Sequence, residues 1–145
     1  MSDPFASGPS FTPPFGGDAQ PQLGILELTD FRRLVLADIP GLIEGAHEGV
    51  GLGDAFLRHI ERTRVIVHLV DLCPQPGELM PIEAYHVIRQ ELEKYSPRLA
   101  ERTEILVGSK SDLTDSDVAL QMFSEDLKRP IHAISGVTGA GLREL

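Results

Sequence analysis

Residues 65–72 read VIVHLVDL, a nearly unbroken apolar run rich in β-branched side chains. A short run of this kind is typical of a strand that is buried on both faces of a parallel sheet. Farther along the chain, residues 104–107 and 131–134 predict two more strands. Helical patterns that begin near Pro81 and Thr114 lie between the three strands. This alternation predicts an α/β fold with a mainly parallel sheet and right-handed crossovers.

The spacing of apolar side chains predicts the helices. Pro81 suits the first position of a helix, and the residues after it keep helical spacing. Thr114 is followed three residues later by Asp117, which resembles the capping box at the start of a helix. The expected inward stripe of this second helix consists of Val118, Met122, Phe123 and Leu127. Residues 139–145 read as the first turn or two of a further helix.

The chain before this pattern divides near residue 22. Residues 1–22 are about half Gly, Pro and Ser, a composition that favours a disordered tail. Residues 23–28 and 31–39 are two apolar runs separated by a short break, which predict an antiparallel hairpin. We therefore expect a disordered tail over 1–22 and one compact domain over 23–145.

The composition argues against several classes of protein. A single cysteine, Cys73, excludes a disulfide framework and a cysteine-based zinc site, and it fits a reducing cytosol. No run approaches the ~18 apolar residues that span a bilayer, and the first residues carry no secretory signal. The net charge of −9 argues against a broad electrostatic surface for nucleic acid. We expect a cytoplasmic protein that uses neither a membrane nor direct, sequence-specific contact with nucleic acid.

Polar residues follow three of the predicted strands at the point where each strand ends. Asp38 follows the second run of the hairpin, and Asp38–Gly41 form an Asp-x-x-Gly turn. A carboxylate there can hold Mg²⁺, usually through a water, and a glycine lets a backbone N–H approach a terminal phosphate. Ser109–Asp112 and Ser135–Val137 follow two of the parallel strands. Because ligands of such sheets bind beyond the carboxyl ends of the strands, the three loops predict one site.

The second and third loops have the chemistry to bind guanine. The carboxylate of Asp112 can accept hydrogen bonds from guanine N1–H and N2–H₂, a donor pair that adenine lacks. The stem of Lys110 can lie along the base and sugar, and backbone N–H groups of the loop Ser135–Gly139 could reach a base carbonyl oxygen. Taken alone, each motif also fits a simpler structure: a strand-ending turn, a solvated turn with a helix cap, and a Gly-rich loop.

Together, in this order and spacing, the motifs resemble the Obg family of GTPases, within the translation-factor-related P-loop class. The strongest part is residues 36–72, LADIPGLIEGAHEGVGLGDAFLRHIERTRVIVHLVDL, which is similar to the family's second switch, the following helix and the next strand. Residues 92–97, LEKYSP, also resemble the family. The resemblance covers about residues 21–145. It implies a P-loop-NTPase-like three-layer α/β/α sandwich, with residues 23–145 forming part of an OBG-type G domain.

The resemblance also implies roles for single residues. GTP or GDP would be the ligand, Mg²⁺ the cofactor and the large ribosomal subunit a partner. The phosphates would contact Asp38, Ile39, Pro40 and Gly41, with Asp38 reaching Mg²⁺ through a water. Guanine would contact Ser109, Lys110, Ser111, Asp112, Ser135, Gly136 and Val137. Leu42 stands where many GTPases have a water-orienting glutamine, so we expect slow intrinsic hydrolysis and activation by another group, an ion or the ribosome.

The chain departs from the family pattern in two places. It contains no Gly-x-x-x-x-Gly-Lys-[Ser/Thr] sequence, the P-loop that cradles the phosphates, and the first switch has no counterpart. In the family fold, the strand before that loop lies between the strand ending at Asp38 and the strand over 65–72. We therefore expect an incomplete α/β/α fold, in which the first strand, the P-loop and the end of the last helix are missing. Ser109 stands where asparagine is usual, which should weaken the bracing of its loop.

Three functions remain open at this point. The first is an Obg-type GTP-binding protein associated with ribosome assembly, whose GTPase activity is impaired by the missing P-loop. The second is a nucleotide-independent pseudo-GTPase that keeps the surface of residues 41–62 for a partner. The third is an inactive fragment. Titration with a fluorescent guanine nucleotide and Mg²⁺ separates the first from the other two.

Overall fold

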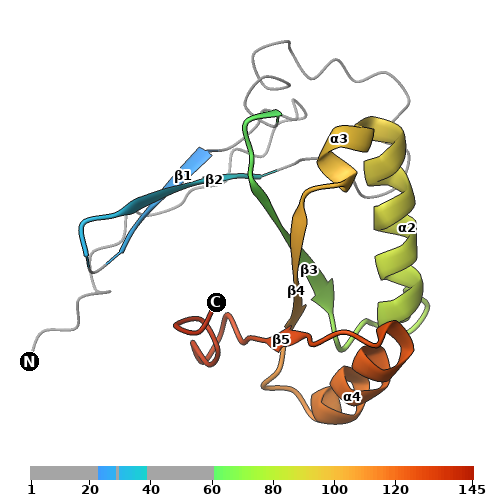
Figure 1. Cartoon of the computed structure of the whole chain (residues 1–145). Coiled ribbons are helices and arrows are strands. Elements are labelled where there is room, and N and C mark those ends of the chain that lie inside the picture. Colours follow the sequence, from blue (N-terminus) through green and yellow to red (C-terminus); the bar gives the residue numbers. More distant parts are fainter. Residues whose placement is uncertain (1–22, 29, 39–60) are drawn as a thin grey trace, which may run out of the picture.

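The computed structural model describes residues 23–28, 30–38 and 61–145, which form two sheets (Figure 1). The strands of the first, antiparallel sheet are β1 (Leu23–Glu27) and β2 (Arg33–Ala37). The strands of the second, parallel sheet are β3 (Val65–Asp71), β4 (Thr103–Ser109) and β5 (His132–Ala133), in that order.

The helices are α2 (Pro81–Tyr95), α3 (Pro97–Ala100) and α4 (Ser116–Leu127). Within these ranges, none is long and apolar enough to cross a membrane. The predicted hairpin and α/β alternation are confirmed, while residues 1–22 lie outside the described part.

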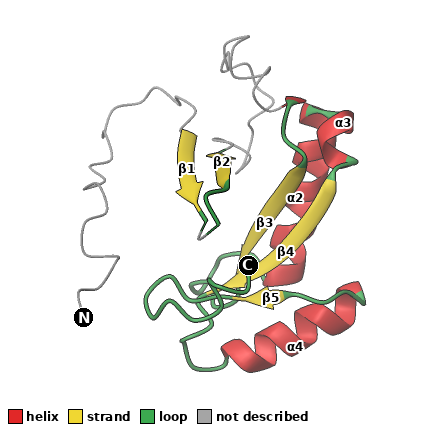
Figure 2. Cartoon of the chain, turned by 60° about the vertical axis from the view of Figure 1, so that its left-hand side comes forward, coloured by secondary structure: helices red, strands yellow, loops and turns green. Residues whose placement is uncertain are grey.

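The parallel sheet and its helices enclose the core. β3 and β4 pair along their whole length, and α2 lies beside them while α4 lies near β5 (Figure 2). The core side chains come from β3 and its end, from β4 and from both long helices: Val70, Leu72, Leu106, Tyr85 and Phe123. The rings of Tyr85 and Phe123 meet edge-on at a centroid distance of 6.0 Å, which joins α2 to α4. This packing fixes the carboxyl ends of β3 and β4 relative to each other.

β3 is not buried on both faces within the described residues, contrary to the prediction. His68 and Val70 are buried beneath α2 and α4, but Val65, Val67 and Leu69 are 45 %, 47 % and 57 % exposed. Successive side chains of a strand point to opposite faces, so the exposed set marks the opposite face of the sheet. None of the described helices covers that face. The described residues therefore form two of the three layers that the resemblance implies.

The start of α4 and its inward stripe also differ from the prediction. The helix begins at Ser116 after an N-cap at Asp115, whose side chain makes no capping hydrogen bond, so the Thr114–Asp117 capping box is wrong. The helix begins later because turns hold residues 110–116, with Leu113 N–H donating to the Lys110 carbonyl at 3.1 Å. Of the four predicted inward side chains, Phe123 and Leu127 pack on the core, whereas Val118 and Met122 are each 59 % exposed. Ala119 and Leu120 pack against the core in their place.

The chain after β5 forms turns, not the start of a helix. Gly139 and Gly141 have φ angles of 79° and 74°, in the left-handed region that glycine adopts readily and a right-handed helix does not use. A Cβ built on Gly141 would lie 2.1 Å from the carbonyl oxygen of Ala133. The turn therefore folds back against β5, which holds the residues after β5 in place.

The hairpin gains little burial from the described residues. Its register pairs Leu23 with Ala37 and Glu27 with Arg33, yet Ile25 and Val35 at its centre are 67 % and 68 % exposed. β2 and β3 belong to different sheets and are not hydrogen-bonded to each other. An isolated two-stranded hairpin is marginally stable in water. The parallel sheet, not the hairpin, is therefore the rigid platform of the described molecule.

Candidate functional site

Two of the three predicted loops meet at the carboxyl edge of the parallel sheet. β4 ends at Ser109, and the chain leaves β5 through Ile134 and Ser135. The backbone N–H of Ser111 donates to the carbonyl oxygen of Ile134 at 3.0 Å. The hydroxyl of Ser135 donates to Asp112 Oδ1 at 2.6 Å. The structure therefore brings the loops Ser109–Asp112 and Ser135–Val137 into direct contact.

Ser135 is the centre of this contact. Its side chain is fully buried, with 0 % exposure. Its hydroxyl oxygen accepts hydrogen bonds from the backbone N–H groups of Val137 at 3.2 Å and Thr138 at 3.0 Å. Because the same hydroxyl donates to Asp112, it fixes both the turn after β5 and the orientation of a carboxylate that is itself exposed. A carboxylate offers about four lone-pair positions, so Asp112 keeps capacity for a ligand's N–H groups.

The backbone donors of the third loop are not equally available. The N–H of Ser135 donates to the Ala140 carbonyl oxygen at 3.0 Å, and the N–H of Val137 donates to the Ser135 hydroxyl. Of the three predicted donors, Gly136 is the one whose N–H has no hydrogen-bond partner among the described residues. Gly136 is exposed, and a Cβ added to it would meet no atom within 4 Å, so this residue is not packed against the described chain. Among Ser135, Gly136 and Val137, Gly136 is therefore the residue whose backbone N–H remains free for a ligand within the described ranges, and the contacts with guanine stay a prediction.

The loop after β4 is braced by serine hydroxyls. Ser109 donates to the Val70 carbonyl oxygen of β3 at 3.2 Å, which ties the two strand ends together. Ser116 donates to the Ser111 carbonyl oxygen at 2.9 Å, which ties the loop to the start of α4. Ser109 therefore braces the sheet edge, although its short side chain makes no hydrogen bond to the loop after β5.

Lys110 has a partner that the sequence analysis did not include. Its ammonium lies 2.5 Å from Asp71 Oδ2, at the end of β3, and this hydrogen bond raises the pKa of Lys110. The other oxygen of Asp71 accepts the Cys73 N–H at 2.8 Å. An acidic residue at the carboxyl end of a predicted strand was the signal that could have identified Asp71.

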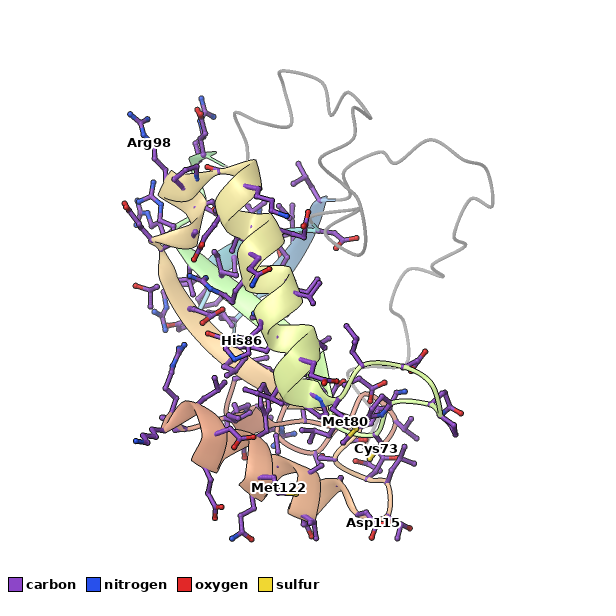
Figure 3. All side chains as sticks on the ribbon, turned by 90° about the vertical axis from the view of Figure 1, so that its right-hand side faces the viewer. Cys73, Met80, His86, Arg98, Asp115 and Met122 are labelled. Atoms are coloured by element: carbon purple, nitrogen blue, oxygen red, sulfur yellow. The ribbon has the colours of Figure 1, made fainter. Side chains whose placement is uncertain are left out.

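Cys73 lies beside this edge but is not suited to nucleophilic chemistry. Figure 3 shows it at the same end of the molecule as Asp115, and its sulfur lies 3.8 Å from the Thr114 carbonyl oxygen. Burial and the charge of Asp71 raise the pKa of its thiol, so the thiolate is disfavoured.

The predicted phosphate loop falls mostly outside the described residues. Asp38 is described and exposed, at the end of the hairpin, whereas Ile39, Pro40, Gly41 and Leu42 are not described. No hydrogen bond or ion pair joins Asp38 to the two contacting loops within the described ranges. Those ranges also contain no group of three or more His, Cys, Asp or Glu side chains that could hold a metal. The role of Asp38 as a water-mediated Mg²⁺ ligand therefore stays a prediction.

A buried ionic cluster lies away from these loops, near the start of β4. The Glu104 carboxylate accepts hydrogen bonds from Arg129 at 2.7 Å and from the His68 ring at 3.0 Å. Nη1 of Arg89 lies 3.5 Å from Oε1 of Glu104. Burial alone would raise the pKa of Glu104, but the hydrogen bonds from His68 and Arg129 and the charge of Arg89 outweigh it and hold the pKa at about 2. The cluster joins β3, β4, α2 and the segment before β5, which gives it a structural role.

Comparison with known proteins identifies the family. Residues 16–110, about two thirds of the chain, match the family described as "50S ribosome-binding GTPase". The chain belongs to this GTPase family. Curated relatives named "GTPase Obg" include those of Anoxybacillus flavithermus, 53 % identical over 127 residues, and Bacillus licheniformis, 54 % identical over 127 residues. Each alignment covers 86 % of this chain but 29 % of the relative, so the chain spans less than a third of their length. The predicted Obg-family G-domain identity and its α/β fold class are confirmed.

Proposed function

We propose that this chain binds guanine nucleotides as part of an Obg-type G domain, and that the loops after β4 and β5 bind the base. The observation that carries the proposal is the 2.6 Å hydrogen bond between the Ser135 hydroxyl and Asp112 Oδ1. It joins two loops from separate parallel strands at the sheet edge where ligands of this fold class bind. Family membership supports the same ligand class.

The proposed recognition follows from the donors and acceptors that remain free. Guanine presents two adjacent donors, N1–H and N2–H₂, and the exposed, oriented carboxylate of Asp112 accepts both. The Gly136 N–H then donates to the carbonyl oxygen at position 6. Adenine presents an amino group at position 6 and lacks the N1–H, so it loses all of these bonds. The site therefore discriminates by chemistry as well as by shape.

We infer that this chain hydrolyses GTP poorly by itself. Its sequence contains no phosphate-binding Gly-x-x-x-x-Gly-Lys-[Ser/Thr] loop, and Leu42 offers no hydrogen bond to orient an attacking water. Binding then depends mainly on the base, so guanosine, GDP and GTP should bind with similar affinity. Contact with the large ribosomal subunit and a cytoplasmic location are proposed from the family's ribosome-binding description.

Titration of the purified chain with fluorescent GDP, with and without Mg²⁺, tests the proposal. We expect saturable binding that unlabelled GDP competes away and unlabelled ADP does not. Lack of binding at millimolar nucleotide would remove the proposal. Asp126→Asn is the matched control for the Asp→Asn variants of the site described below. Because Asp126 is an exposed carboxylate near the end of α4, this variant should bind GDP like the wild type.

A nucleotide-independent interaction module is the second candidate. It is favoured by the exposed side chains Val65, Val67 and Leu69, on the face of β3 that none of the described helices covers. Sedimentation with purified large ribosomal subunits, with GDP, GTP or no nucleotide, distinguishes the candidates. Binding that is the same in all three conditions supports the second candidate, and nucleotide-dependent binding supports the first.

A further inference from the structure

The side chain of Lys110 is held by a residue from a different strand. Lys110 lies in the proposed guanine loop, and its ammonium pairs with Asp71 Oδ2 at 2.5 Å. Asp71 and Ser109 are opposite each other in the β3–β4 register, so the pair spans the two strand ends. Among the described residues, Asp71 is the one carboxylate that forms an ion pair with Lys110.

Asp71 is itself fixed in orientation. Its Oδ1 accepts the Cys73 N–H at 2.8 Å, while Oδ2 faces Lys110. The next residue, Leu72, donates its N–H to the Ser109 carbonyl oxygen at 3.3 Å and is buried in the core. The carboxylate is therefore attached to the rigid part of the sheet. A charged side chain that it holds will share that rigidity.

The backbone of Lys110 is held by a turn. Lys110 has a φ of 62°, in the left-handed region, and its carbonyl oxygen accepts the Leu113 N–H at 3.1 Å. These features fix the backbone but not the four-carbon side chain. Asp71 supplies the missing constraint by holding the far end of that side chain.

We propose that Asp71 is a positioning residue of the guanine site, which holds Lys110 so that its aliphatic stem forms a fixed wall beside Asp112. This inference rests on the proposed function. The Lys110 and Asp71 side chains are 44 % and 34 % exposed, and ion pairs with that much exposure contribute little to folding stability. The ion pair therefore restricts the motion of the Lys110 side chain and contributes little to the stability of the fold. A free lysine side chain loses considerable rotamer entropy when a ligand orders it, and Asp71 removes that cost before the ligand arrives.

Asp71→Asn tests the role, because the amide keeps an oxygen for the Cys73 N–H and loses the charge that faces Lys110. We expect the dissociation constant for fluorescent GDP to rise about five- to tenfold, because the ligand must then order the Lys110 side chain itself, with an unchanged unfolding midpoint. Asp126→Asn, which removes an equal charge elsewhere on the surface, should leave the dissociation constant unchanged. Equal binding by wild type and Asp71→Asn would overturn the inference while leaving the proposed function intact.

A double-mutant cycle separates positioning of Lys110 from a general structural role. Lys110→Met keeps the apolar stem and removes the ammonium. If Asp71 acts through Lys110, Asp71→Asn should have no further effect on GDP binding in the Lys110→Met background. A full additional loss in that background would assign the effect to the Cys73 turn and overturn the inference.

An NMR measurement tests, in the absence of nucleotide, whether the ion pair restrains the Lys110 side chain. We expect ¹³C relaxation of the Lys110 Cε group to report a restrained side chain in the wild type and a mobile one in Asp71→Asn. Equal mobility in the two proteins would overturn the inference even if GDP binds. If the wild type binds no guanine nucleotide, both the proposed function and the role of Asp71 in it fail, whatever the relaxation data give.

Discussion

At the scale of single residues, Asp112 determines which base the site accepts. Asp112→Asn replaces one acceptor oxygen with an amide donor, which suits a base with a carbonyl at position 2, such as xanthine. We expect the affinity of this variant for GDP to fall at least about tenfold. Its affinity for xanthosine diphosphate (XDP) should rise above its affinity for GDP. Competition of each nucleotide against the same fluorescent probe measures both changes. Unaltered base preference in this variant would place the base elsewhere.

Residue identities predicted part of this site. The pattern Lys-x-Asp after a strand indicated Asp112, and the structure places it against the predicted loop Ser135–Val137. The sequence did not indicate that Ser135 and Val137 use their own N–H groups within the turn, because these bonds depend on the path of the chain after β5. Asp71 was missed for a related reason, since its partner Lys110 is distant in sequence and near only because β3 and β4 are parallel neighbours.

At the scale of elements, Glu104 connects the sheet to its helices and should make stability depend on pH. Its folded pKa of about 2 lies below the ordinary value of 4.5, so its contribution is complete above about pH 4.5 and is lost as the pH falls toward 2. Glu104→Gln leaves Arg89 and Arg129 with a neutral partner in place of a buried carboxylate. We expect it to lower the free energy of unfolding at pH 7 by about 2–3 kcal/mol in urea titrations.

The same variant provides the pH test. Urea midpoints measured from pH 6 to pH 2 should fall less steeply for Glu104→Gln than for the wild type, because the titrating group is gone. Glu93→Gln, a change at an exposed position on α2, should follow the wild-type curve. Parallel curves for the wild type and Glu104→Gln would mean that other carboxylates cause the acid sensitivity.

Elements were predicted best where local pattern and tertiary packing agree. β4 and α2 follow their apolar spacing and pack on the core through Leu106 and Tyr85. In α4, the apolar spacing correctly indicated Phe123 and Leu127, but it also included Val118 and Met122, whereas Ala119 and Leu120 are the side chains that pack on the core beside Phe123. A run such as residues 65–72 cannot indicate by itself whether one or both faces are covered, because burial depends on elements distant in sequence.

At the scale of the whole molecule, the alternation of strands and helices predicted the parallel sheet, but no local pattern indicates where the hairpin lies relative to it. β1 and β2 pair only with each other, and their central side chains Ile25 and Val35 are mostly exposed. β4, in contrast, is paired on both sides and has Leu106 and Val107 buried. Opening the hairpin exposes little new apolar surface, whereas opening β4 disrupts the core.

This difference predicts two levels of protection in hydrogen–deuterium exchange. Amides of β4, such as that of Val107, should exchange only through global unfolding, and those of the β1–β2 ladder should exchange through local opening, at least about a hundredfold faster. Mass spectrometry of peptides over residues 23–37 and 103–109 measures both in one sample. The faster class should not slow when GDP binds, because the proposed base contacts lie on the parallel sheet alone. Protection of the hairpin equal to that of β4 would show that the two sheets unfold as one cooperative unit, and that β2 is held by more than its pairing with β1.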